Sequence, residues 1–271
     1  MFRNSVRVTK AVVLAAGLGT RMRKPEAGAL DEAQQRAAAA GHKAMMPFGR
    51  PFLDHLLHHL AEAGIRRVSI VTAAAHDEAR AYYTSLQTTR IALECAIQAE
   101  PRGTADAVAA AGSFIGDDLA LVVNGDNLYP VGALGALSEG GAPALVGFSR
   151  RGLLAGGIPV ERLERFALIV SRDGWLDHIV EKPDARTLAT AGDRAQLSMN
   201  CWVVPPDIVA AVSTLPLSPR GELELPMAVA ALVARGIGFR VLPCDEPVLD
   251  LSHRRDVAVI GAALEGREVR L

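Results

Sequence analysis

A glycine-rich segment follows the first apolar run of the chain. Residues 14–23 read LAAGLGTRMR. Small residues let a backbone approach a ligand closely, so that its N–H groups can bind phosphate oxygens, and Arg21 adds a forked cation. The segment lacks the Gly-Lys-Ser/Thr of a P-loop and the third glycine of the dinucleotide fingerprint. It predicts either a phosphate-binding loop or an ordinary tight turn between a strand and a helix.

Three other segments carry side chains that could take part in the same chemistry. Lys43 precedes a helix start and can reach a phosphate, or it is a solvated loop lysine. Asp126, in VVNGDN, follows an apolar strand, where a carboxylate suits Mg²⁺ or makes an Asx-type turn. Glu181 and Lys182 stand before a proline, where they can hold sugar hydroxyls and a phosphate, or form an ion pair at a sheet edge.

Alternating strands and helices must position these residues. In the first half, apolar runs of strand length and helical spacing alternate with short connections, which predicts a parallel sheet covered on both faces. The expected strands are residues 6–14, 67–73, 91–97, 119–123 and 144–148, and the expected helices are 52–60, 76–86 and 103–114.

The second half has a mixed pattern. An Asp-Gly turn signal between residues 166–170 and 175–180 predicts a hairpin. Strands are also expected at 199–204 and 238–242, and helices at 226–235 and from 253 onwards. No internal repeat is present, and in particular no hexapeptide array typical of a β-helix.

Composition excludes several classes of protein. The 271 residues are 50% hydrophobic, which excludes intrinsic disorder, and the net charge of −1 gives no general attraction to nucleic acid or membrane. Three dispersed cysteines favour a reducing, cytoplasmic location over a disulfide framework or structural zinc. No apolar run is long enough to cross a membrane, and residues 1–19, although signal-like, fit a buried strand better.

The order and spacing of these motifs resemble those of the sugar-1-phosphate nucleotidyltransferases, the NDP-sugar pyrophosphorylases, over about residues 8–260. The resemblance is to glucose-1-phosphate thymidylyl- and uridylyltransferases in particular. It rests on residues 11–22 (AVVLAAGLGTRM), 43–57 (KAMMPFGRPFLDHLL), 98–107 (QAEPRGTADA), 122–127 (VVNGDN), 180–184 (VEKPD), 220–225 (RGELEL) and 249–251 (LDL).

The resemblance implies a fold, a domain organisation and a reaction. The fold is a Rossmann-like mixed, mostly parallel sheet flanked by helices. One nucleotidyltransferase domain would span 1–271, with a nucleotide-binding half at about 1–130 and a sugar-binding half at about 131–271. The reaction would join a nucleoside triphosphate, UTP or dTTP being favoured, to a sugar 1-phosphate, releasing pyrophosphate with Mg²⁺ as cofactor.

The resemblance also implies roles for individual residues. Arg21, Lys43, Asp126 and Lys182 would be catalytic, and Asp126 and Asp250 would hold Mg²⁺. Sugar phosphate would bind at Glu181, Lys182 and Asn200. Nucleotide would bind at Ala15, Ala16, Gly17, Gly19, Thr20, Arg21, Gln98, Gly103 and Thr104.

Two departures from the family pattern stand out. Arg21 and Lys43 are about twice as far apart as the family pattern leads us to expect. The extra residues, 26–42, are rich in alanine and predict a helical insertion that acts as a lid or as a contact in a homo-oligomer. The insertion leaves Lys24 as an alternative to Lys43. Ala167 stands where the family has a glycine, which narrows the expected sugar pocket.

Other functions are compatible with parts of the pattern. These are a catalytically silent sugar-nucleotide regulator, guanylyl or cytidylyl transfer to another sugar phosphate, and an NAD(P)-dependent dehydrogenase that uses the Gly17 loop. His55, His58, His59 and Glu62 have helical spacing, and we expect a solvated helix face there rather than a metal site.

Overall fold

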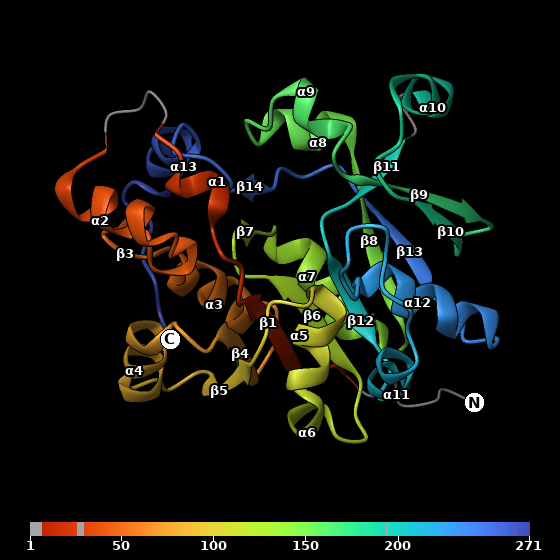
Figure 1. Cartoon of the computed structure of the whole chain (residues 1–271), viewed down its shortest axis with the longest axis horizontal. Helices are drawn as coiled ribbons and strands as arrows, with labels where there is room; N and C mark the ends of the chain where they lie inside the picture. The colour runs from red at the N-terminus through yellow and green to blue at the C-terminus, as the bar shows by residue number, and fades with distance from the viewer. Residues whose placement is uncertain (1–6, 26–29, 193–194) are drawn as a thin grey trace.

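The computed structural model describes residues 7–25, 30–192 and 195–271. They form a ten-stranded mixed sheet in the order β11-β9-β10-β13-β8-β12-β6-β1-β4-β5, flanked by helices (Figure 1). The expected α/β fold class is therefore confirmed. The strands are β1 (Lys10–Ala15), β4 (Arg67–Ala73), β5 (Ala92–Gln98), β6 (Ala120–Asn124), β8 (Ala144–Ser149), β9 (Ala167–Arg172), β10 (Trp175–Val180), β11 (Gln196–Ser198), β12 (Cys201–Val204) and β13 (Arg240–Cys244).

The first half of the chain builds the parallel part of the sheet. Strands β6, β1, β4 and β5 are neighbours in that order, and each pair is parallel. Because the carboxyl ends of parallel strands meet at one edge, the loops after these strands come together. This edge is where the glycine-rich segment and Asp126 are placed.

The second half adds mainly antiparallel pairs. Strand β12 pairs antiparallel with β6 and β8, and β9 and β10 form the expected hairpin, with positive φ at Asp173 and Gly174. Strand β13 is parallel to β8. Two short ribbons lie outside the main sheet: β2 (Pro47–Phe48) with β3 (Arg50–Pro51), and β7 (Asn127–Leu128) with β14 (Leu249–Asp250).

Helices cover both faces of the sheet, and strand alternation divides the core between them. Ala11 and Val13 of β1 join the cluster that includes α3 (Phe52–Glu62) and α7 (Val131–Gly140). Val12 joins the cluster of α5 (Thr104–Ala110), α11 (Asp207–Ser213) and α12 (Leu225–Ala234). The longer helices are α2 (Glu32–Ala40), α3 (Phe52–Glu62), α4 (Asp77–Ser85), α5 (Thr104–Ala110), α7 (Val131–Gly140), α10 (Ala185–Ala191), α11 (Asp207–Ser213), α12 (Leu225–Ala234) and α13 (Asp256–Leu264). The shorter ones are α1 (Thr20–Arg23), η1 (Lys43–Met45), α6 (Gly112–Ile115), α8 (Arg150–Ala155) and α9 (Val160–Leu163).

Several expected boundaries were wrong. The strand expected at 199–204 begins only at Cys201, because Asn200 has φ +54, which is incompatible with an extended strand. The helix expected at 103–114 is two helices, α5 and α6. Helix α2 lies within the expected insertion, of which residues 26–29 are outside the described residues; Val6 of the first expected strand is outside them too.

The expectation of a solvated face on α3 was wrong for His55 and His59, whereas Glu62 is exposed as expected. His55 is buried, and the ring of His59 makes a 2.7 Å hydrogen bond to the carbonyl oxygen of Tyr129. Burial lowers the pKa of both histidines. Packing against neighbouring segments, which helical spacing alone does not reveal, decides their environment. Among the described residues, no helix is both long and apolar enough to span a membrane.

Candidate active site

The glycine-rich loop connects the carboxyl end of β1 to α1. A side chain at Gly17 would meet nothing within 4 Å, so the backbone there is open to a ligand. Gly19 has φ +60, and a Cβ at this position would lie 2.1 Å from the carbonyl oxygen of Gly41. Glycine is therefore required at position 19 both for its backbone conformation and for this close contact.

The insertion is packed directly against this loop. Gly41 caps the carboxyl end of α2 with φ +74, and a Cβ there would lie 2.7 Å from the carbonyl oxygen of Leu18. Arg23 donates a hydrogen bond of 3.0 Å to the carbonyl oxygen of Ala40. The carboxyl end of α2 thus packs against Leu18 and Gly19 and supports the conformation of the glycine-rich loop.

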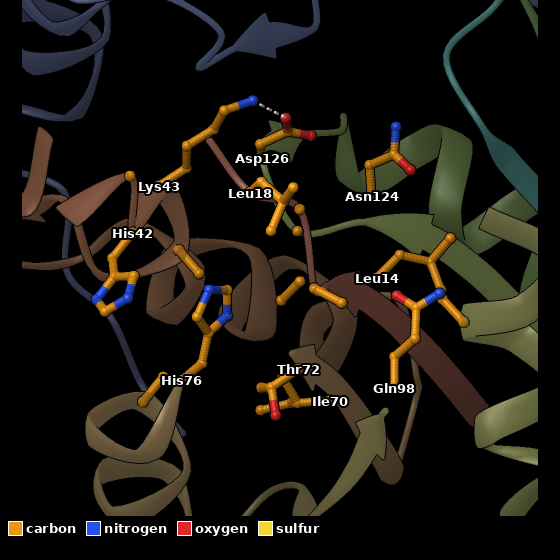
Figure 2. A pocket seen from close by; sticks show the side chains of 18 of the residues that line it. Leu14, Leu18, His42, Lys43, Ile70, Thr72, His76, Gln98, Asn124 and Asp126 are labelled. Atoms are coloured by element: carbon orange, nitrogen blue, oxygen red, sulfur yellow. Dashed lines mark hydrogen bonds and ion pairs between the residues drawn. The ribbon is translucent and has the colours of Figure 1, made fainter. Parts of the chain in front are cut away.

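A cavity of about 470 Å³ lies at the carboxyl ends of β1, β4, β5 and β6 (Figure 2). Its walls include most of the residues expected to bind nucleotide. These are Ala15, Ala16, Gly17, Thr20, Gln98, Gly103 and Thr104, and the walls also include Lys43 and Asp126, which were expected to be catalytic. Chain segments that are far apart in the sequence therefore meet around a single space.

Lys43 and Asp126 form an ion pair at one side of this cavity (Figure 2). Lys43 lies in η1, and its Nζ is 2.6 Å from Oδ2 of Asp126, in the loop between β6 and β7. Both side chains are partly exposed, so the cation and the anion can each be reached by a ligand. The structure places the lysine that follows the insertion, rather than Lys24, beside the carboxylate.

The opposite side of the cavity is built by the loop before α5 and the segment before α12. Gly103 has φ +112, and a Cβ there would lie 2.4 Å from the carbonyl oxygen of Leu223. The backbone N–H of Leu225 donates to the hydroxyl of Thr104, and that of Ala105 donates to the carbonyl of Leu223. The segment 220–225, singled out in the sequence, thus fixes the loop that carries Gly103 and Thr104.

Asp250 lies next to this arrangement but is buried in a polar network. It is paired with Asn127 across the ribbon of β14 and β7, and the backbone N–H of Leu251 donates to the carbonyl of Asp126. Its carboxylate accepts hydrogen bonds from Arg162, Asn127 and Ser252. Burial raises the pKa of Asp250, and the charge of Asp126 raises it further.

The residues expected to bind sugar phosphate lie outside the cavity wall. Lys182 has φ +44 and Asn200 has φ +54, a conformation that is strained for residues with a side chain and that concentrates at functional sites. Because Cys201 pairs antiparallel with Val123, Asn200 lies beside the carboxyl end of β6, the end that leads to Asp126. Burial raises the pKa of Glu181, and the nearby Glu224 carboxylate raises it further.

Arg21 and Gly19 are likewise absent from the cavity wall, and Arg21 is exposed on α1. The sequence analysis gave no role to other side chains in the wall, namely His42, Thr72, His76, Tyr83, Asn124 and Glu222. His42 and His76 pack edge to face, with ring centroids 4.7 Å apart. Position was the signal for two of them: Thr72 lies near the carboxyl end of strand residues 67–73, and His76 follows that end, which joins the ligand-binding edge.

Known proteins resemble this chain in sequence and in fold. A family model described as nucleotidyl transferase matches residues 10–237. The low-salt glycan biosynthesis nucleotidyltransferase Agl11 of Haloferax volcanii is 26% identical over 84% of this chain and 58% of its own length. The bifunctional protein GlmU of Rhodospirillum rubrum is 30% identical over 96% of this chain and 53% of its own length. The chain thus spans little more than half the length of these relatives.

Solved structures show the same fold. The UTP-bound UGPase of Acinetobacter baumannii superposes with a TM-score of 0.73 at 19% identity, covering 97% of this chain and 95% of that one. A UDP-glucose pyrophosphorylase complexed with UDP-glucose gives a TM-score of 0.72 at 16% identity, covering 96% of this chain and 100% of that one. At these identities the likeness concerns the fold.

Proposed function

Because this chain belongs to the nucleotidyl transferase family, we propose that it transfers a nucleotidyl group from UTP or dTTP to a sugar 1-phosphate, with Mg²⁺. The products are an NDP-sugar and pyrophosphate. One observation carries the proposal: a single cavity joins the open glycine-rich loop, the Lys43–Asp126 pair and the Gln98–Thr104 region. These parts suit a triphosphate, the reacting phosphate and a base, respectively.

In the proposed reaction, an oxygen of the sugar phosphate attacks the α-phosphorus in line. A new P–O bond forms, and the bond to the leaving pyrophosphate breaks. The attacking phosphate is already anionic at neutral pH, so no protein general base is needed. Catalysis then consists of positioning and charge neutralisation. The loop from Ala16 to Arg21 binds the triphosphate, and Arg21 binds the leaving pyrophosphate from α1.

Lys43 would neutralise phosphate charge on the nucleotide. Its ammonium group is already held at the cavity wall by Asp126. When a triphosphate enters the cavity, its anionic oxygens can replace the Asp126 carboxylate as the partner of the Lys43 ammonium group. At the other end of the reaction, Lys182 would hold the attacking phosphate, and Glu181 and Asn200 would bind sugar hydroxyls.

The carboxylates of Asp126 and Asp250 fit a divalent cation. Burial is the main cause of the raised pKa of Asp250, and the charge of Asp126 adds to it, so a cation held by these carboxylates would relieve their repulsion. Asp126 is the more available of the two, since Asp250 already accepts hydrogen bonds from three side chains. When bound, Mg²⁺ would draw charge from the α-phosphate.

We also propose that the protein acts in the cytoplasm. The unpaired cysteines Cys95, Cys201 and Cys244 fit a reducing compartment.

The experiment that tests the proposal measures pyrophosphate release from UTP, dTTP, GTP, CTP and ATP, each with common hexose and hexosamine 1-phosphates and Mg²⁺. We expect release that requires both substrates and is greatest with UTP or dTTP. A nucleotide that binds tightly but yields no pyrophosphate with any sugar phosphate would contradict the proposed catalysis. It would favour a silent sugar-nucleotide regulator.

A further inference from the structure

The side-chain amide of Gln98 is held in one orientation at the end of β5. Gln98 lines the cavity and is only 6% exposed. Its Nε2 donates two hydrogen bonds, one of 3.0 Å to the carbonyl oxygen of Gly103 and one of 2.8 Å to Oδ2 of Asp106. Both amide hydrogens are therefore used by the protein, and Oε1 is left as an acceptor.

A flipped amide would be strongly disfavoured at this position. The flip would place Oε1 against two oxygens that have no proton to donate, a carbonyl and a carboxylate. The identity of the neighbouring groups therefore fixes the positions of Oε1 and Nε2. Figure 2 shows Oε1 of Gln98 on the side of the cavity, with the nitrogen directed away from it.

Asp106 is itself held in place by a second residue. Its Oδ1 accepts hydrogen bonds from Nε and Nη2 of Arg102, at 3.1 and 2.6 Å. The two carboxylate oxygens therefore have separate partners, Arg102 on one side and Gln98 on the other. Arg102 therefore holds the Asp106 carboxylate in place, and the carboxylate in turn holds the amide that faces the cavity.

We propose that Asp106 is a positioning residue that makes the base site selective for pyrimidines with a ring N–H, uracil and thymine, over cytosine. The inference rests on the proposed function, in which Gln98 faces the base. A free amide could rotate to donate to N3 of cytosine as easily as it accepts from N3–H of uracil. An amide held by Asp106 together with the carbonyl of Gly103 can only accept, so the N3 lone pair of cytosine meets a second acceptor.

The test measures binding of UTP, dTTP and CTP by calorimetry, without a sugar phosphate. For the unmodified chain we expect CTP to bind at least about tenfold more weakly than UTP, since a good hydrogen bond is replaced by two opposed acceptors. In Asp106→Asn, Arg102 retains the amide oxygen, and the new NH₂ faces Gln98 and can donate to a flipped Oε1. Only the carbonyl oxygen of Gly103 then still opposes the flip. The CTP/UTP ratio of Kd should then fall to about three or below.

Two further variants separate positioning from a general effect. Asp117→Asn is the matched control, because Asp117 is exposed after α6 and outside the cavity wall, and the ratio should stay at the unmodified value. Gln98→Leu removes the amide that is proposed to contact the base and should bring the CTP/UTP ratio of Kd close to one. This variant keeps the proposal testable if Asp106→Asn fails to fold. Circular dichroism reports the folding of each variant.

Several outcomes would overturn the inference. One is equal binding of CTP and UTP by the unmodified chain. Another is a folded Asp106→Asn variant that binds UTP and CTP equally more weakly, so that the ratio of their Kd values is unchanged. Asp106 would then be merely structural. Selective UTP binding without pyrophosphate release from any sugar phosphate would contradict the proposed function alone. Absence of any nucleotide binding would contradict both.

Discussion

At the scale of single residues, Asp126 is the acidic group best placed to act on a phosphate in the cavity. It follows β6, pairs with Lys43 and is partly exposed. We predict that Asp126→Asn lowers kcat by at least about 100-fold, since it removes the charge that would hold the metal. The thermal unfolding midpoint should change little, because the side chain is not buried. Near-normal kcat at saturating Mg²⁺ would contradict this role.

Gly103 tests the loop on the other side of the cavity. Gly103→Ala would bring a Cβ within 2.4 Å of the carbonyl oxygen of Leu223, at a residue with φ +112. We predict a loss of stability of about 2 kcal/mol or more and a raised KM for the nucleotide, measured by urea unfolding and initial rates.

Gly135→Ala is the matched control for this substitution. Gly135 lies inside α7, where an added Cβ meets nothing within 4 Å. There the same change should stabilise the protein by about 0.5–1 kcal/mol, because alanine favours helix. Equal effects of the two substitutions would show that the contact with Leu223 is unimportant.

At the scale of elements, the insertion determines which lysine reaches the cavity. Lys24 ends α1 on the surface, whereas Lys43 lies in η1 beside Asp126. We predict that Lys43→Ala lowers kcat/KM for the nucleotide by about 100-fold, while Lys24→Ala changes it by less than about threefold. Initial rates at varied nucleotide concentration check both values. A larger loss for Lys24→Ala would reverse the assignment.

At the scale of the whole molecule, Arg162 ties together three separate segments. From α9 it donates to Asp250 in β14 and to Asp256 at the start of α13, and all three side chains are almost fully buried. Arg254, just before α13, donates to the carbonyl of Met22 in α1. Together, these contacts connect the second half of the chain to α1, the helix that follows the glycine-rich loop.

We predict that Arg162→Met destabilises the fold by about 3–5 kcal/mol near neutral pH, because two buried carboxylates lose their cation. The pKa of Asp250 is already raised in the folded state, so protonation of this carboxyl group favours folding. This contribution to the free energy of unfolding is present at low pH and is lost as the pH rises through the folded-state pKa. Removing Arg162 raises this pKa further. The deficit should therefore be larger at about pH 8 than at about pH 5, as measured by urea unfolding.

The control for this prediction is Arg151→Met. Arg151 pairs with Asp245 on the surface, where both side chains are exposed. An exposed pair contributes little, so the change should stay within about 0.5 kcal/mol and show little pH dependence. A deficit of Arg162→Met that grows as the pH falls would contradict the electrostatic explanation.

The sequence by itself determined the local elements and the types of reactive residue. Strand β4 was predicted at its observed limits, 67–73, because alternating and continuous apolar patterns report burial directly. The motifs at Gly17, Lys43 and Asp126 likewise predicted the chemistry that we propose for the cavity, since the residue types needed to bind phosphate and metal are few.

Only the tertiary structure decided which groups contact each other, because contacts between distant segments leave no local pattern. It buried His55, paired Lys43 with Asp126 and enclosed Asp250 with Arg162, a residue that the sequence analysis did not single out. It also brought His42 and His76 to the cavity. The orientation of the Gln98 amide depends on Gly103 and Asp106 around it, and is therefore a property of the folded chain.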